Sequence, residues 1–238
     1  MNVAIIGSGS WATALAKIIM HNVTDINWHI RRQEVIDEFV EIRRNPNHLE
    51  WAYFDVSRIH FSTDLNTVID QSDLIVLAVP SPYLKQSLDD ITVDMSQKMV
   101  ISAVKGMIPD ENLLVTEYMH KYFHVPEENL GVIAGPCHAE EIALERLSYL
   151  TVGCKDMEKA REWSQLFDTP YVRTTPSNDV EGLEYASVMK NIYAIAAGIC
   201  KSLHYGDNFQ AVLLTNAMHE MIRFAQAKSD IPRDITAS

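Results

Sequence analysis

The stretch MNVAIIGSGSWATALA (residues 1–16) predicts a strand, a glycine-rich turn and a helix in immediate succession. Val3–Ile6 is a short apolar run typical of a buried strand, and the small and apolar residues after the turn predict a helix. Gly7, Gly9 and Ala12 match the G-x-G-x-x-G/A pattern that binds a dinucleotide when it lies between a strand and a helix. The sequence therefore predicts a nucleotide-binding turn at its start.

Each small residue of the pattern has a separate physical role. Gly7 permits the tight turn, Gly9 lets the backbone approach a pyrophosphate, and Ala12 allows the helix to pack closely on the strand. The helix N-terminus then offers free N–H groups and a positive dipole end to the phosphates. An ordinary strand-turn-helix without a ligand is the alternative. The start of a repeating β-α pattern favours the cofactor interpretation.

Composition indicates a soluble globular protein that does not bind nucleic acid. The chain has 238 residues, of which 47% are hydrophobic and 22% charged, and its net charge is −12. Its three cysteines, Cys137, Cys154 and Cys200, form no CxxC pair, which favours a reducing compartment. We find no signal peptide and no apolar run long enough to cross a bilayer. We therefore expect a cytoplasmic protein without membrane insertion.

The second predicted strand, Asp25–Ile30, ends in a pair of arginines. Dinucleotide folds carry an acidic residue near this position to bind the ribose of NAD, or an arginine to bind the 2′-phosphate of NADP. Arg31 and Arg32 therefore favour NADP over NAD, and a solvated pair at a strand end is the alternative. We expect the cofactor to be NADP or NAD.

The middle of the chain continues the alternation of strands and helices. Apolar runs predict strands at residues 59–61, 73–79, 99–104, 130–134, 149–153 and 171–174, and helices at residues 33–44, 64–69, 110–122 and 157–167. Pro80-Ser81-Pro82 is predicted as a loop. The predicted fold is α/β, with a Rossmann-like, mostly parallel sheet. Lys105 follows a central strand at the sheet edge where ligands of such folds bind.

The pattern changes at residue 177, where we place a domain boundary between residues 1–177 and 178–238. Asn178 and Glu181 resemble a capping box that begins an all-helical domain. The helix that follows is apolar nearly all round, which predicts burial on most sides. Lys190 lies in its middle. A desolvated lysine has a lowered pKa suited to proton transfer, and a lysine that extends to solvent is the alternative.

A histidine pair and a cysteine could in principle bind a metal or act as a nucleophile, but the sequence favours neither role. His120 and His124 have a spacing that can hold a metal, but no third ligand is evident, so a surface pair is favoured. Cys137 lies near a helix start, where a thiol pKa can fall. Because no base accompanies it, we interpret Cys137 as a wall residue of the site.

Several motifs together resemble the NAD(P)-dependent glycerol-3-phosphate dehydrogenases of the bacterial type. They are GSGSWATALA from Gly7, VPS from Val79, VKG from Val104, AGPCHAEE from Ala134, MKNIYAIAAGI from Met189 and GDN from Gly206. The resemblance implies the interconversion of dihydroxyacetone phosphate and sn-glycerol 3-phosphate, which supplies glycerophospholipid synthesis. The partner is then a small phosphorylated three-carbon substrate, and we expect a homodimer.

The resemblance also implies roles for individual residues. The cofactor is contacted by Gly7, Gly9, Ser10, Trp11, Arg31, Arg32, Lys105 and Ala139. The substrate is contacted by Lys105, Gly135, Cys137, Lys190 and Asn191, with Lys190 as the proton acceptor.

The chain departs from the family pattern in three ways. Ala12 stands where the family usually has glycine, and Cys137 replaces a Ser or Thr hydroxyl with a weaker hydrogen-bonding group. The family also continues past Ser238 into a segment that completes the phosphate site, so we expect a C-terminally truncated chain. Two apolar helices without their neighbours are expected to leave an exposed apolar face. The alternatives are a non-catalytic dinucleotide-binding sensor or subunit, and a dehydrogenase of another hydroxy acid.

Overall fold

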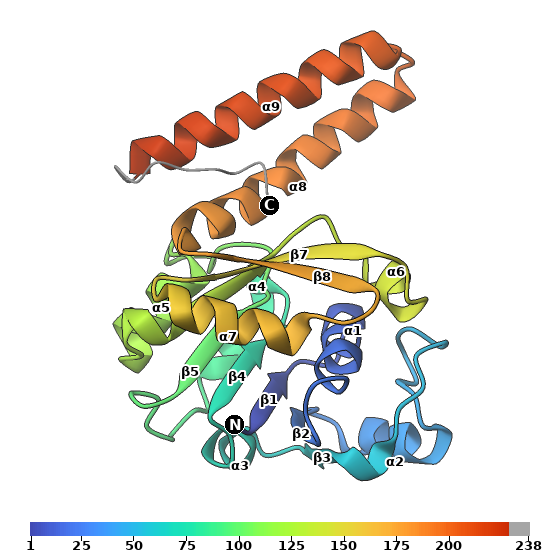
Figure 1. Cartoon of the computed structure of the whole chain (residues 1–238), viewed down its shortest axis with the longest axis vertical. Coiled ribbons are helices and arrows are strands. Elements are labelled where there is room, and N and C mark those ends of the chain that lie inside the picture. Colours follow the sequence, from blue (N-terminus) through green and yellow to red (C-terminus); the bar gives the residue numbers. More distant parts are fainter. Residues whose placement is uncertain (229–238) are drawn as a thin grey trace.

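The structure is a computed structural model that describes residues 1–228. Figure 1 shows a sheet covered by helices, which we call the sheet domain (residues 1–177), and a pair of long helices that rises from it, which we call the arm. The arm consists of α8 (Val180–Ser202) and α9 (Asp207–Lys228), and α9 runs back along α8. Of the predicted second domain, 178–238, residues 229–238 lie outside the described part.

The sheet domain is built on one eight-stranded sheet in the order β3-β2-β1-β4-β5-β6-β7-β8. All neighbouring strands are parallel except β6 and β7, which are antiparallel. The strands are β1 (Val3–Ile6), β2 (Ile26–His29), β3 (Ile59–Ser62), β4 (Leu74–Leu77), β5 (Met99–Ser102), β6 (Leu130–Ala134), β7 (Ser148–Cys154) and β8 (Val172–Ser177). The predicted Rossmann-like, mostly parallel sheet is confirmed.

Seven helices of the described chain belong to the sheet domain. They are α1 (Ser10–Ile19), α2 (Gln33–Ile42), α3 (Leu65–Asp70), α4 (Ser81–Leu88), α5 (Val115–Phe123), α6 (Ala139–Ala143) and α7 (Met157–Phe167). Short 3-10 helices precede β3 and β6, at Val56–Arg58 and Glu127–Asn129.

The structure corrects two predicted elements of the sheet domain. The helix predicted at residues 110–122 begins later, at Val115, because Asp110 and Asn112 have positive φ angles that a right-handed helix cannot contain. The predicted loop at Pro80-Ser81-Pro82 is instead the start of α4. Pro82 lies in its first turn, where a missing N–H costs nothing.

The cap of α8 also differs from the prediction. Asp179, and not Asn178, is the N-cap, and its side chain accepts a hydrogen bond of 3.0 Å from the backbone N–H of Gly182. Both side chains can serve this purpose, so the sequence pattern alone does not distinguish two adjacent candidates.

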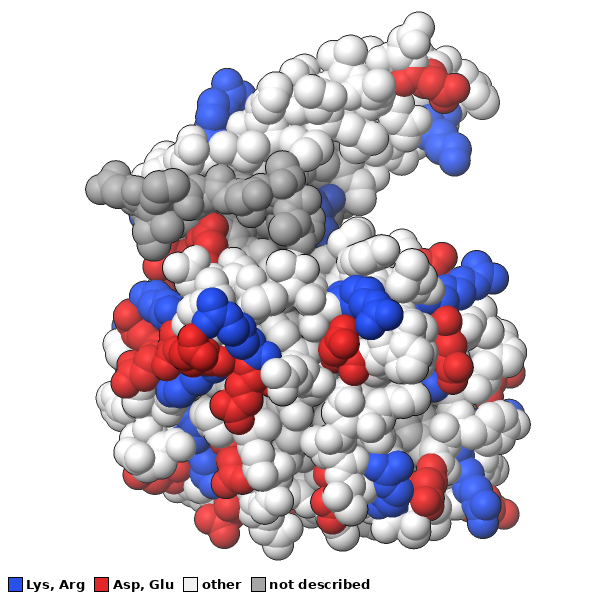
Figure 2. Space-filling model, viewed as in Figure 1, with Lys and Arg blue, Asp and Glu red and all other residues white. Residues whose placement is uncertain are grey.

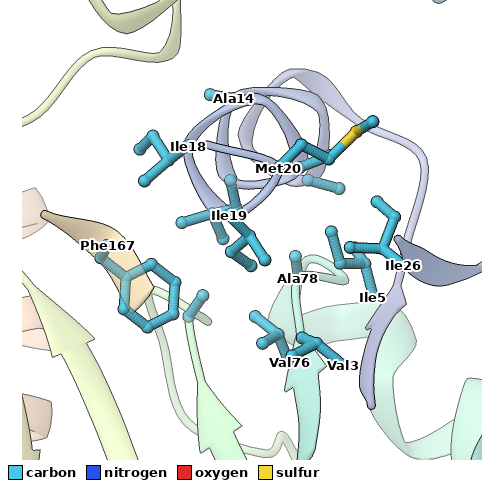
Figure 3. Packing of buried hydrophobic residues seen from close by; sticks show 14 of the residues in the cluster. Val3, Ile5, Ala14, Ile18, Ile19, Met20, Ile26, Val76, Ala78 and Phe167 are labelled. Atoms are coloured by element: carbon cyan, nitrogen blue, oxygen red, sulfur yellow. The ribbon is translucent and has the colours of Figure 1, made fainter. Parts of the chain in front are cut away.

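The core lies on both faces of the sheet. Figure 3 shows one face, where Ile19 of α1 lies on the side of the helix that faces Val76 and Ala78, Ile18 lies on its flank, and Phe167 closes one side. A second cluster on the opposite face is formed under α3, α4 and α5. Each fully buried side chain of this size stabilises the fold by about 1.5–3 kcal/mol. The sheet edge that carries the glycine-rich turn is therefore held by a rigid core.

Within residues 1–228, the arm packs on the sheet domain through the first turns of α8, and Lys190 further along the helix adds a hydrogen bond to it. Val180 and Leu183 are buried, and Leu183 contacts Gly153 of β7, where a Cβ atom would lie only 2.7 Å from the leucine side chain. Further along α8 the apolar residues are exposed, Ile192 by 60% and Ile195 by 67%. The prediction that this helix is buried on most sides is therefore wrong, because α9 covers one side only. The predicted exposed apolar face is confirmed.

No described helix is both long and apolar enough to span a membrane.

Candidate active site

The glycine-rich turn has the local geometry that its sequence predicts. Gly7 has a φ of 128°, and a Cβ atom there would lie 2.5 Å from the carbonyl oxygen of Ala78, so only glycine fits. A Cβ atom on Gly9 would meet no heavy atom within 4 Å. α1 begins at Ser10, and no side chain caps its N-terminus. Free space and uncapped N–H groups make this turn a suitable cradle for phosphates.

Two adjoining pockets, each of about 310 Å³, open at this turn, and we call them together the groove. Both are lined by Gly9 and by Ala78, Val79 and Pro80 at the end of β4. The first pocket is also lined by Gly7, His29, Arg31, His48 and Tyr83. The second is lined by Ser10, Trp11, Ser81, Val104 and Lys105. The groove thus runs along the carboxyl ends of the strands, where open α/β sheets bind ligands.

The two predicted arginines have different positions. Arg31 lines the first pocket, and within residues 1–228 it makes no hydrogen bond or ion pair with another side chain. Arg32 is exposed, is the N-cap of α2, and does not line the groove. No carboxylate lines the first pocket. The structure therefore brings one guanidinium, and not two, to this end of the groove.

His48 is a groove residue that the sequence analysis missed. Its Nδ1 lies 3.2 Å from the Oγ of Ser10, at the start of α1. The segment around His48 has no regular secondary structure, and 38 residues separate the two partners. No local sequence pattern predicts that this segment folds back over the turn.

Lys105 lies at the other end of the groove, beside Trp11. Its Nζ is 4.7 Å from the centroid of the Trp11 ring, a distance suited to a cation–π contact. Burial lowers the pKa of the Lys105 amine below its ordinary value. The same Nζ donates a long hydrogen bond of 3.4 Å to the carbonyl of Cys137, so Lys105 connects the groove to the turn after β6.

Lys190 reaches the same turn from the arm. Its Nζ donates a hydrogen bond of 3.0 Å to the carbonyl of Gly135, which is 55 residues away in sequence. Gly135 has a φ of 139°, and a Cβ atom there would lie 2.6 Å from the carbonyl oxygen of Tyr149. Burial lowers the pKa of the Lys190 amine, and the nearby charge of Lys105 lowers it further. Two lysines therefore converge on one backbone turn.

Cys137 and Ala139 complete this turn. The Sγ of Cys137 donates a hydrogen bond of 2.9 Å to the carbonyl of Tyr149, and burial raises the pKa of the thiol. A protonated, hydrogen-bonded thiol is a poor nucleophile, which agrees with a wall residue. Ala139 is buried as the first residue of α6. Asn191 follows Lys190 but is exposed and does not line the groove.

The described residues contain no cluster of three or more side chains suited to a metal ion. His120 and His124 are both exposed, and the Nδ1 of His120 lies 2.9 Å from the carbonyl of Val125. The favoured interpretation, a surface pair, fits these positions.

Comparison with known families identifies the chain along nearly its whole length. Residues 2–160 match the family model described as the N-terminus of NAD-dependent glycerol-3-phosphate dehydrogenase. Residues 179–237 match the model described as the C-terminus of the same family. Residues 161–178, between the two matches, contain most of α7 and all of β8.

Individual relatives agree with these matches. The chain is 32% identical to the glycerol-3-phosphate dehydrogenase [NAD(P)+] of Exiguobacterium sp. over 93% of its length and 65% of the relative's. The Bacillus subtilis protein of the same name is also 32% identical, over 93% of this chain and 64% of the relative. The chain thus spans slightly less than two thirds of the length of these two relatives.

A solved structure supports the same assignment. The glycerol-3-phosphate dehydrogenase of Plasmodium falciparum superposes with a TM-score of 0.87 and 26% identity, covering 98% of this chain and 68% of the other. With both family models matched in order and the groove in the expected place, the chain belongs to the NAD-dependent glycerol-3-phosphate dehydrogenase family.

Proposed function

We propose that the chain binds NADP or NAD in the groove and interconverts dihydroxyacetone phosphate and sn-glycerol 3-phosphate. The observation that carries this proposal is the convergence of Lys105 and Lys190 on the turn at residues 135–138. Lys105 also lines the groove, so a substrate held by this turn lies at the end of a bound dinucleotide. The names of the relatives support this choice of substrate.

The two lysines suit the chemistry of this reaction. The nicotinamide supplies or accepts a hydride, so the protein must move a proton at the substrate oxygen. Lys190 is the proton donor in the direction of ketone reduction and the acceptor in the direction of alcohol oxidation. Its lowered pKa brings the amine closer to neutral pH, where both protonation states are accessible. Lys105 adds a second positive charge that attracts the anionic substrate.

The local charge matters because the protein as a whole repels anions. The net charge of −12 disfavours a phosphorylated ligand at long range. Lys105, Lys190 and the N-terminus of α1 together present positive potential at one edge of the sheet. This supports a small phosphorylated substrate, and it argues against nucleic acid as a partner.

We infer that NADPH binds more tightly than NADH. Arg31 lines the first pocket and has no hydrogen-bonded or ion-paired side chain among residues 1–228, and a guanidinium can form paired, charge-assisted hydrogen bonds with a 2′-phosphate. The acidic residue that would bind the ribose of NAD is missing from the lining of this pocket. Dissociation constants for NADPH and NADH, measured by cofactor fluorescence, test this preference directly.

The proposed reaction is tested by mixing the chain with dihydroxyacetone phosphate and NADPH, and in parallel with NADH. We expect cofactor absorbance at 340 nm to fall and glycerol 3-phosphate to accumulate. Tight NADPH binding without turnover, in this chain and in a version extended by the remaining length of its relatives, contradicts the proposed reaction. That result would support the non-catalytic dinucleotide-binding alternative.

We further infer that a second copy of the chain covers the apolar face of the arm. The exposed residues Ile192, Ile195 and Ile199 lie on α8, and Figure 2 shows an arm surface with few charged side chains. A large exposed apolar surface is typical of an interaction site. Sedimentation of the wild-type chain is expected to show a dimer, and Ile195→Asp is expected to shift it toward monomer. A wild-type monomer contradicts this inference.

A cytoplasmic location is also part of the proposal. Cys137, Cys154 and Cys200 are all free thiols, which suits a reducing compartment. Cell fractionation with an antibody to the chain tests this location.

A further inference from the structure

A buried asparagine lies behind the glycine-rich turn. The side chain of Asn45 is only 2% exposed, and its Nδ2 donates hydrogen bonds to the carbonyl of Ser8 (2.9 Å) and the Oγ1 of Thr13 (2.8 Å). The Thr13 hydroxyl in turn donates to the carbonyl of Gly9 (3.0 Å). Asn45 and Thr13 thus hold two carbonyls of the turn, those of Ser8 and Gly9, and the third, that of Gly7, accepts from the Nε1 of Trp28 (2.7 Å).

The amide of Asn45 uses all its groups in this arrangement. Both N–H groups of its Nδ2 are donated to the turn, and its Oδ1 accepts a hydrogen bond of 3.0 Å from the backbone N–H of Asn47. An amide carries two donors on nitrogen and an acceptor on oxygen, so a flipped side chain would lose these contacts. The orientation of Asn45 is therefore unique.

Fixing the two carbonyls also fixes the N–H groups on the opposite sides of the same peptides. The described chain has no cis peptide bond, and in a planar trans peptide the N–H points away from the C=O. The carbonyl of Ser8 points to Asn45, so the N–H of Gly9 points away from it. The carbonyl of Gly9 accepts hydrogen bonds from both the backbone N–H and the hydroxyl of Thr13 (3.0 Å each), so the N–H of Ser10 points away from Thr13.

These N–H groups belong to residues that line the groove, whereas Asn45 does not. Gly9 and Ser10 line it, and Asn45 lines a neighbouring cavity of about 490 Å³, which shares Ser10 and His48 with the groove. The same segment also contacts the start of α1, through the 3.2 Å contact between His48 and Ser10. The turn and the start of α1 are thus held by one segment that is far from them in sequence.

We propose that Asn45 is a positioning residue for cofactor binding, which orients the N–H groups of Gly9 and Ser10 toward the pyrophosphate. When donors are already oriented before the ligand binds, binding costs less conformational entropy. Asn45 acts through the turn and does not itself touch the cofactor. This inference rests on the dinucleotide binding proposed above.

The first experiment compares a ligand that has a pyrophosphate with one that lacks it. We expect Asn45→Ala to weaken NADPH binding by roughly tenfold, the effect of about one well-made hydrogen bond to a charged group. Binding of 2′-AMP, measured by displacement of NADPH fluorescence, is expected to stay unchanged. Equal losses for both ligands, or no loss for NADPH, overturn the proposal.

Asn27 is a matched control. It is 8% exposed, and its Nδ2 donates to the Oγ of Ser72 (2.8 Å) and the carbonyl of Gln71 (3.3 Å), at the other edge of the same sheet. Asn27→Ala removes two side-chain hydrogen bonds, as Asn45→Ala does. We expect it to lower thermal stability without changing the NADPH affinity. If it weakens NADPH binding as much as Asn45→Ala, the effect of Asn45 is general destabilisation and the proposal fails.

Thr13 provides a rescue test of the same network. Thr13→Val removes the hydroxyl and is expected to weaken NADPH binding, whereas Thr13→Ser keeps the hydroxyl and is expected to retain the affinity. Combining Asn45→Ala with Thr13→Val is expected to cost less than the two single losses multiplied, because both act through one network. Independent effects contradict the proposal. A wild-type chain that binds no dinucleotide instead refutes the proposed function itself.

Discussion

The sheet domain and the arm contain similar apolar residues, but the sheet domain buries them and the arm leaves them exposed. In the sheet domain Ile18 of α1 is completely buried, whereas Ile195 in the arm is 67% exposed. Figure 1 shows the reason, since helices lie on both sides of the sheet, whereas in the described part of the arm α8 has α9 alone beside it. Apolar content alone therefore does not create a core, and a partner surface is required.

The site lies where these two regions meet. The groove belongs entirely to the sheet domain, and its glycine-rich turn, Arg31 and Lys105 are held by strands and helices with a complete core. Lys190 comes from α8, just past the turns that pack on the sheet. We therefore expect cofactor binding to depend on the sheet domain alone, and turnover to require Lys190 of the arm as well.

The largest expected effect separates these two contributions. Lys190→Ala is expected to lower turnover by roughly 10²–10⁴-fold, the usual range for loss of a general acid or base. NADPH affinity is expected to stay unchanged, as measured by fluorescence titration. Lys201→Ala, an exposed lysine on the same helix, serves as the control and is expected to be neutral. A loss of NADPH affinity in Lys190→Ala contradicts the division between the two regions.

A second pair of variants compares the packing of the two regions directly. Ile18→Ala removes a fully buried side chain and is expected to lower the free energy of unfolding by about 2–5 kcal/mol. Ile195→Ala is expected to change it by less than about 0.5 kcal/mol, provided that monomer is measured. Urea denaturation at low protein concentration provides both values. Similar losses would mean that the arm face is already packed.

The third prediction concerns Glu184, a buried carboxyl in the first turns of α8. It accepts hydrogen bonds from the backbone N–H and the hydroxyl of Thr116 in α5, and burial raises its pKa from 4.5 to about 7. The unfolded chain therefore loses its proton first as pH rises. Stability should fall between about pH 4.5 and pH 7, by up to about 3 kcal/mol, and then change no further from this group.

Glu184→Gln tests this pH dependence. The variant has no carboxyl to titrate, so its stability is expected to vary less than that of the wild type between pH 5 and pH 8. Thermal unfolding across this range measures the difference. An unchanged slope in the variant would show that Glu184 ionises normally where the arm joins the sheet domain.

The smallest expected effect concerns cofactor preference within the sheet domain. Arg31→Ala is expected to weaken NADPH binding by roughly tenfold and to leave NADH binding nearly unchanged, because the guanidinium addresses the 2′-phosphate. Arg32→Ala is the neighbouring control and is expected to have little effect, since Arg32 does not line the groove. Equal losses for both cofactors in Arg31→Ala contradict a role in discrimination.

The sequence predicted the parts of the fold that depend on short-range patterns. The strand at Val3–Ile6, the turn at Gly7 and Gly9, and the alternation of strands and helices follow from periodicity and backbone sterics. The errors occur where local signals compete. Asn178 and Asp179 are both good N-caps. Residues 110–114 resemble a helical pattern, although two of them have left-handed backbone conformations.

The sequence by itself thus determined the β-α order, the glycine-rich turn and, through its motifs, the family. Only the tertiary structure decided that Arg31 and not Arg32 lines the groove, that His48 and Asn45 hold the turn, and that Lys190 reaches Gly135. The physical reason is distance along the chain. Contacts between residues that are 32 to 55 positions apart depend on how complete layers pack, and no local pattern records that packing.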